Sequence, residues 1–108
     1  MNIGSLYQVK ERFWVLFPTK EIVTRAAARL DAPITVGGCG SDSDKNAAWY
    51  AARYSRKYNC NVTWFSPESF VVFIEEDGKF KKVLTSEGLI GWIQVNETWL
   101  ECFEEVKP

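Results

Sequence analysis

Catalysis and metal binding near neutral pH depend most often on histidine, and this chain of 108 residues contains none. A Ser-His-Asp triad or a Cys-His pair is therefore impossible within one chain. The three cysteines, Cys39, Cys60 and Cys102, form no C-x-x-C pair, so the sequence offers no zinc site. We expect no enzyme activity, no cofactor and no metal, with Cys60 and Cys102 as free, buried thiols. An enzyme that uses Cys39 or a carboxylate as its nucleophile is the least favoured alternative.

One cluster of side chains indicates binding, and it falls on a predicted helix over 44–58. Trp49, Arg53 and Arg56 share one face of that helix at positions i, i+4 and i+7. An indole beside guanidinium groups holds an aromatic group, a nucleobase or a carboxylate-bearing peptide by stacking and cation–π attraction. The alternative is that Trp49 fills a groove and the arginines pair with acidic side chains, which is the commoner arrangement because tryptophan is mostly buried. The exposure of Trp49 distinguishes the two.

Two further patterns indicate structure rather than chemistry. The segment 37–41, Gly-Gly-Cys-Gly-Ser, precedes a helix as a phosphate-binding loop would, but it has no P-loop lysine and Asp42 and Asp44 would repel phosphate. We expect a loop and a capped helix there. The acidic residues 101, 104 and 105 lack the clustering of a metal site and predict a solvated sheet edge.

Hydrophobic periodicity predicts the elements that position these residues. The helix over 44–58 begins in a cluster of serines and aspartates and ends in basic residues, as the helix dipole favours. A second helix is predicted over 19–30, capped by Thr19, with an edge strand over 20–24 as the alternative. An Asp77-Gly78 turn predicts a hairpin. Strands are expected over 4–10, 13–17, 33–36, 60–65, 70–75, 80–84, 89–95 and 100–106.

The size and composition predict one soluble domain over 1–108, because 46% hydrophobic residues can form a single modest core. The longest apolar runs fall far short of the roughly 20 residues of a membrane span, and the N-terminus has no secretory signal. We therefore expect a cytoplasmic protein. Residues 1–60 hold nine Lys/Arg and five Asp/Glu, whereas residues 61–108 hold four and nine. The favoured explanation is that the two halves pack on each other or merely present two differently charged surfaces; the alternative is that one charged face meets a partner.

The order of these elements resembles an SH3-like small barrel. The resemblance rests on Gly4-Ser5-Leu6-Tyr7, on the hairpin at Asp77-Gly78, and on the segment 88–93, Gly-Leu-Ile-Gly-Trp-Ile, which is similar to the G-x-x-G-W-[IV] segment of bacterial SH3-type domains. It implies a mainly β, α+β fold with residues 18–67 as a helical insertion and with Trp92 inside the barrel. Similarity to peptide-binding SH3 domains at Leu6-Tyr7 adds Tyr7 to the candidate binding residues. Lys79-Phe80-Lys81 stands where those domains have paired tryptophans, which argues against binding of proline-rich peptides.

We expect the insertion to form a β-α-β unit over 34–65. Its helix would pack Ala47, Ala51 and Tyr54 on the sheet, and its strands would extend the barrel. The chain also resembles, in size and composition, small proteins of marine cyanobacterial viruses, which implies an accessory or virion-associated role.

These features predict a non-catalytic module that binds or assembles with an unidentified protein partner. The candidate binding residues are Trp49, Arg53, Arg56 and Tyr7. The alternative is a nucleic-acid-binding accessory protein that uses the basic helix over 44–58. Association of the chain with itself stays open, and no membrane partner is expected.

Overall fold

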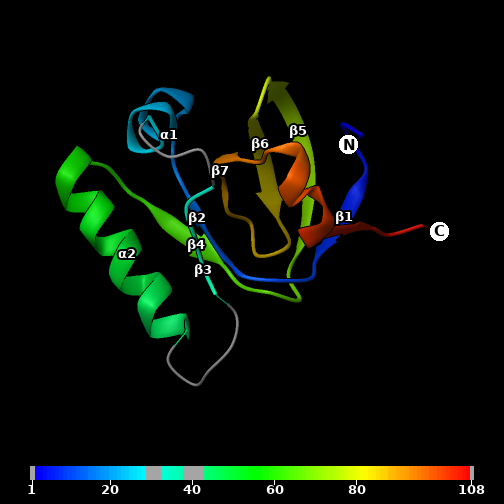
Figure 1. Cartoon of the computed structure of the whole chain (residues 1–108), viewed down its shortest axis with the longest axis horizontal. Coiled ribbons are helices and arrows are strands. Elements are labelled where there is room, and N and C mark those ends of the chain that lie inside the picture. The colour runs from blue at the N-terminus through cyan, green and yellow to red at the C-terminus, as the bar shows by residue number, and fades with distance from the viewer. Residues whose placement is uncertain (1, 29–32, 38–42, 108) are drawn as a thin grey trace.

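The computed structural model describes residues 2–28, 33–37 and 43–107, which form two antiparallel sheets and the helices beside them (Figure 1). The fold is mostly β with a few helices, which confirms the expected α+β class. In chain order the elements are β1 (Leu6–Val9), β2 (Phe13–Leu16), α1 (Lys20–Ala26), β3 (Thr35–Val36), α2 (Ser43–Tyr58), β4 (Thr63–Phe65), β5 (Phe70–Asp77), β6 (Phe80–Thr85), β7 (Ile90–Gln94), the 3-10 helix η1 (Glu97–Cys102) and β8 (Phe103–Glu105).

The larger sheet has five strands in the order β7-β6-β5-β1-β8, so the first strand lies between a hairpin strand and the last strand. Alternate residues such as Tyr7, Val71, Phe73 and Val83 point inward and form the main core, because successive strand residues face opposite sides of a sheet. Within the described residues the strand pairing does not close into a barrel, since β7 and β8 are the two edges of this sheet.

The smaller sheet has the order β3-β2-β4, with β2 in the centre. Trp14 in β2 pairs with Thr35 on one side and with Phe65 on the other. The expectation that β3 and β4 extend the barrel is therefore wrong. Strands β3 and β4 pair with β2 instead, and β2 is apolar on both faces. Trp14 and Leu16 pack in the main core, while Val15 packs in a second core beneath the helices.

The two sheets meet at Phe17 and Trp92, which exchange two backbone hydrogen bonds. The N–H of Trp92 donates to the carbonyl oxygen of Phe17 at 2.6 Å, and the N–H of Phe17 donates back at 3.0 Å. Gly91 is required at this junction, since a Cβ there would lie 2.5 Å from the Phe17 oxygen. Trp92 is 8% exposed, which confirms its expected burial. Gly88, with φ of 88°, forms the turn before β7.

Both predicted helices are present, and the first is shorter than predicted. The Thr19 hydroxyl accepts the N–H of Ile22 at 3.2 Å and begins α1, which ends at Ala26; residues 27–28 form a turn, and residues 29–30 of the predicted helix lie outside the described residues. Ala47 and Ala51 of α2 are buried on the smaller sheet, as expected. None of the helices in the described part of the chain is both long and apolar enough to cross a membrane.

Two local predictions are wrong. The first three residues of the expected strand over 100–106 belong to η1, and only Phe103–Glu105 pairs as a strand. The hairpin turn consists of Gly78 and Lys79, whereas Asp77 stays in β5 opposite Phe80. Gly78 alone needs the left-handed backbone, with φ of 59°.

Candidate binding surface

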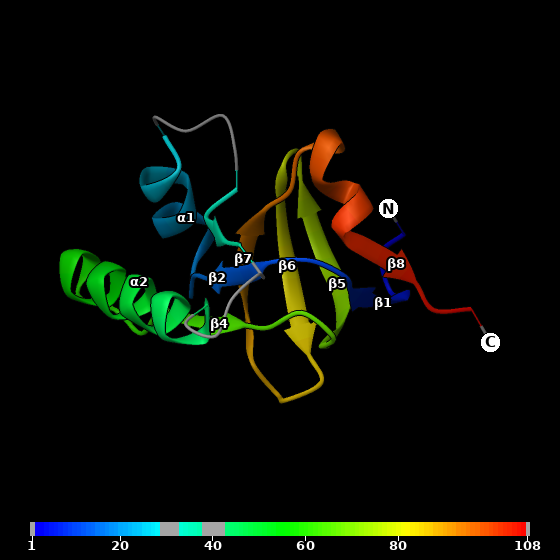
Figure 2. The same ribbon diagram turned by 60° about the horizontal axis from the view of Figure 1, so that its bottom comes forward.

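Helix α2 lies along one side of the molecule and packs against the smaller sheet (Figure 2). Ala47 and Ala51 face that sheet, because residues four apart share one side of a helix. The end of the helix is held by Ser55, whose hydroxyl oxygen accepts the N–H of Val62 at 2.9 Å. Asn59, with φ of 51°, then turns the chain toward β4. The opposite side of α2 is thereby held toward solvent.

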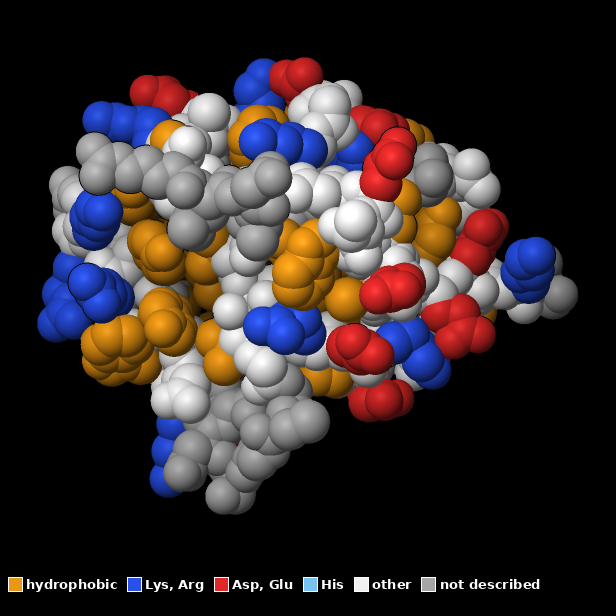
Figure 3. All heavy atoms as spheres, in the orientation of Figure 1, with side chains coloured by type: hydrophobic (Ala, Val, Ile, Leu, Met, Phe, Trp, Pro, Cys, Tyr) orange, Lys and Arg blue, Asp and Glu red, His pale blue; other side chains and the backbone are white. Residues whose placement is uncertain are grey.

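A tryptophan stands exposed on that solvent-facing side. Trp49 is 52% exposed, and Tyr50 beside it is 38% exposed. The Arg53 guanidinium carbon lies 5.4 Å from the centroid of the Trp49 ring, in a cation–π contact. The rings of Trp49 and Tyr50 lie 5.0 Å apart and nearly perpendicular. Basic and apolar side chains gather over α2 in the space-filling view (Figure 3).

Two more tyrosines continue this row toward the end of the helix. Tyr50, Tyr54 and Tyr58 recur every four residues and form one stripe. The rings of Tyr54 and Tyr58 are parallel within 8°, with centroids 6.3 Å apart, and Tyr54 meets the buried ring of Phe17 edge-on. Burial, and then the neighbouring tyrosines, raise the pKa of Tyr54 above its ordinary value of 10.0. Tyr54 therefore stays neutral at physiological pH, and the stripe offers ring faces for stacking.

The cations of this face are not neutralised. Among the described residues, Arg53, Arg56 and Lys57 form no ion pair with a carboxylate. The arginines therefore do not pair with acidic side chains of the C-terminal half, which was the alternative arrangement. We call the face formed by Trp49, Tyr50, Arg53, Arg56 and Lys57 the α2 surface.

Two hollows border the α2 surface. The first, of about 190 Å³, is lined by Tyr50, Arg53, Tyr54 and Lys57. The second, of about 650 Å³, begins at Lys57 and Tyr58 and reaches Arg25 of α1. Lys57 lines both hollows.

The structure brings Trp49, Arg53 and Arg56 onto one exposed helix, as the spacing predicted. Sequence reasoning missed Tyr50 and Lys57, although the recurrence of tyrosine every four residues was a usable signal. Arg25 belongs to a different helix, and no pattern along the chain connects it to the α2 surface.

Tyr7 does not belong to this surface, which corrects the expectation that it binds a partner. It lies in β1, on the side of the molecule far from α2 (Figure 1). Its ring packs edge-on against Phe73 at 5.2 Å, and its hydroxyl accepts the N–H of Asn2 at 2.8 Å. Tyr7 is buried and already hydrogen-bonded, so it is a core residue.

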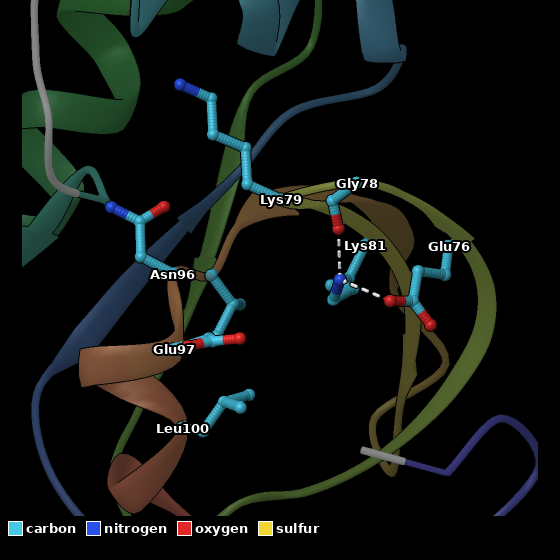
Figure 4. Close-up of a pocket in the computed structure, with 8 residues that line it drawn as sticks. Glu76, Gly78, Lys79, Lys81, Asn96, Glu97 and Leu100 are labelled. Carbon is cyan, nitrogen blue, oxygen red and sulfur yellow. Dashed lines mark hydrogen bonds and ion pairs between the residues drawn. The ribbon is translucent and has the colours of Figure 1, made fainter.

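A separate cavity of about 370 Å³ lies between the β5–β6 hairpin and η1 (Figure 4). The buried Lys81 amine donates one hydrogen bond to the Glu76 carboxylate at 2.8 Å and another to the carbonyl oxygen of Gly78. The hydrogen bond from Lys81 holds the pKa of Glu76 below its ordinary value of 4.5. Lys81 and Glu76 satisfy each other, so we assign this pair to the fold rather than to a ligand.

The remaining candidates for chemistry are weak. Cys60 is half-buried and Cys102 is buried, both as free thiols, and burial raises the pKa of each. Such thiols are poor nucleophiles at neutral pH. No group of His, Cys, Asp or Glu among the described residues could hold a metal ion, and Glu104 pairs with Lys10 at 3.3 Å. Residues 38–42, which include Cys39, lie outside the described residues.

Comparison with known proteins finds no family model, no curated protein and no solved structure that matches this chain. The chemistry of the α2 surface therefore carries the functional conclusion.

Proposed function

We propose that this protein is a non-catalytic binding module whose protein partner docks on the α2 surface. The observation that carries the proposal is the environment of Trp49, a half-exposed indole with the guanidinium of Arg53 over its ring. Tryptophan, tyrosine and arginine are the side chains that most often dominate binding free energy at protein interfaces. Here one helix presents all three to solvent.

The charge of the α2 surface sets the chemistry of the partner. Arg53, Arg56 and Lys57 present positive charge that no carboxylate of the described residues offsets. A partner segment that brings Asp or Glu side chains gains charge-assisted hydrogen bonds to these groups. Trp49 and Tyr50 add ring faces on which a flat or apolar side chain stacks. We therefore infer an acidic protein segment that also carries an aromatic residue.

Single-stranded nucleic acid is the second candidate. The parallel rings of Tyr54 and Tyr58 beside Lys57 favour it, because bases stack on aromatic side chains while cations follow the phosphates. The surplus of cations on α2 is small for a nucleic-acid interface, and part of the stripe is buried against Phe17. The acidic protein segment accordingly comes first.

We also infer that the five-stranded sheet is an SH3-like small barrel opened by its insertion. In support, the first strand lies between the β5–β6 hairpin and the last strand, and Gly91 and Trp92 occur on β7 as the motif requires. The second sheet and both α-helices arise from the segment between β1 and β5. A small module of this kind suits an accessory or virion-associated role.

The test is binding by the Trp49→Ala/Arg53→Ala double variant. A bead-displayed library of random peptides serves as the protein probe, and mixed single-stranded DNA and RNA serve as the nucleic-acid probe. Lys107→Ala, which removes an exposed cation far along the chain from α2, is the matched control. Circular dichroism verifies that each variant is folded.

We expect the wild type and Lys107→Ala to retain peptides rich in Asp or Glu beside an aromatic residue, and the double variant to retain none of them. Equal retention by the double variant would contradict the proposal. Salt-sensitive binding of nucleic acid without peptide enrichment, lost in the double variant, would replace the protein partner with nucleic acid.

A further inference from the structure

The outer face of the five-stranded sheet carries a second exposed surface, and it is apolar. Leu84 is 40% exposed and Ile90 is 55% exposed, although both lie within paired strands. Leu6, Phe70 and Ile74 are also exposed on strands of this sheet. Antiparallel sheets usually turn a polar face to water, so exposed aliphatic side chains on neighbouring strands need an explanation.

The strand register brings these side chains into one row. Leu6 lies opposite Val72, Val72 lies opposite Leu84, and Leu84 lies opposite Ile90. Residues directly opposite each other share a face of the sheet, so the row crosses four strands. Val106 extends it, because its N–H donates to the carbonyl oxygen of Leu6 at 2.8 Å. We call these five residues the outer band.

The fold covers only one end of this outer face. Trp92 lies two residues after Ile90 on the same side of β7, and it is buried in the second core with Val23 of α1. Helix α1 contacts β6 and β7, and its Val23 lies in the same core cluster as Trp92. The same face of one sheet is thus covered at Trp92 and uncovered at Ile90.

The outer band itself carries no charge, and its surroundings carry both signs. Lys10 pairs with Glu104 at 3.3 Å beside β1, and Glu75 lies opposite Lys82 beside β6. This balance distinguishes the outer face from the α2 surface, whose charged residues Arg53, Arg56 and Lys57 are all cations. An electroneutral apolar face can meet an identical face without charge repulsion, whereas two α2 surfaces would repel each other.

We propose that two copies of this chain pack face to face through their outer bands. A two-fold axis places the same patch of each copy against the other, as in most homodimers, and two twisted sheets pack well about 10 Å apart. The apolar patch is on the order of several hundred Å², at the upper end of what monomers expose. A stable interface buries roughly 800 Å² on each partner, so the outer band would form its apolar centre and the polar side chains around it the rim.

Sedimentation equilibrium of the purified chain, from low to high micromolar concentration, tests the proposal. Ile90→Lys places like charges against each other at the two-fold contact. Ile90→Thr removes apolar surface while it keeps a β-branched side chain, so it preserves the strand. Tyr50→Lys is the matched control, since it introduces the same charge at an exposed residue of the α2 surface.

We expect a dimer for the wild type and for Tyr50→Lys, and a monomer for Ile90→Lys. Ile90→Thr should raise the dimer Kd by about tenfold or more, because burial of an isoleucine contributes more than one factor of ten. Thermal melting establishes whether each variant is folded. If Ile90→Lys does not fold, the result for Ile90→Thr serves as the test. A wild type that stays monomeric throughout, or a dimer that only Tyr50→Lys weakens, would overturn the proposal.

Discussion

The α2 surface and the outer band both expose large apolar side chains, but they differ in charge and in the kind of side chain they present. The α2 surface combines aromatic rings with unpaired cations on long side chains. The outer band has short aliphatic side chains fixed on a hydrogen-bonded sheet. The α2 surface suits a partner segment that is selected by its charge. The outer band suits a second surface that is also apolar.

Because of this difference, one small chain can expose two binding surfaces that each select a different partner. A second copy is repelled by the cations of the α2 surface, and an acidic segment finds no cation on the outer band. If the comparison is correct, each surface can be removed without loss of the other. The predictions below run from the largest expected effect to the smallest.

Trp92→Ala should abolish both surfaces together. Trp92 lies where the two sheets meet and is buried beside Val23, so truncation leaves a cavity at the junction. We expect the free energy of unfolding to fall by about 3–5 kcal/mol, which is comparable to the whole stability of a small domain. Urea denaturation of wild type and variant measures the loss. An unchanged transition midpoint would mean that the junction does not support the two surfaces.

Trp49→Ala alone should weaken capture of an acidic peptide by about 2 kcal/mol, or about thirtyfold in Kd, as truncation of a hot-spot residue does. The dimer mass should not change, because Trp49 lies on α2 and the outer band lies on the larger sheet. Peptide titration and sedimentation of the same samples give both numbers. A simultaneous loss of dimer and peptide binding would show that the two surfaces are one.

Raised salt should weaken peptide binding at the α2 surface and leave dimer formation through the outer band intact. Screening weakens contacts to Arg53, Arg56 and Lys57, so raised sodium chloride should lower peptide affinity several-fold. Apolar contact through the outer band should be unaffected or slightly stronger. Peptide titration and sedimentation at low and high salt make the comparison. Equal salt sensitivity of both events would remove the distinction drawn from charge.

Glu76→Gln should have the smallest effect and should change neither surface. The Lys81 hydrogen bond lowers the folded-state pKa of Glu76, so its stabilising contribution is present above the ordinary value of 4.5 and is lost as pH falls through the folded pKa. We expect the variant to melt below the wild type at neutral pH, with the gap closing in acid. Melting temperatures across that range test this; a gap that widens in acid would contradict it.

Patterns within one segment predicted much of the fold. The 3.6-residue period and the charge distribution of 44–58 predicted α2 and its buried face, because the period of a helix can be found within its own segment. The unbroken apolar run at 13–17 predicted a strand buried on both faces, and β2 is the centre of the smaller sheet. The helical period of α2 also placed Trp49 and Arg53 on one face.

Features that depend on the pairing register of the strands could not be predicted from the sequence. Leu6, Val72, Leu84 and Ile90 are far apart in sequence, and only strand pairing gathers them into the outer band. The segment 97–102 lacks a clear period, and it forms η1 because Cys102 and its neighbours pack on the main core. Tyr7 was predicted to bind a partner from a family resemblance. Its burial could not be predicted, because the exposure of a side chain depends on its tertiary neighbours.

The position of β1 between β5 and β8 has a consequence for the order of folding. The first strand pairs only with segments from the last part of the chain, so its hydrogen bonds require closure of nearly the longest loop available. Such non-local pairing makes folding slow, in the range of milliseconds to seconds. Before β1 pairs with β5 and β8, helix α2 and the smaller sheet can already assemble from neighbouring segments. A nascent chain would therefore present its helical side first and complete the larger sheet only after the residues of β8 have been synthesised.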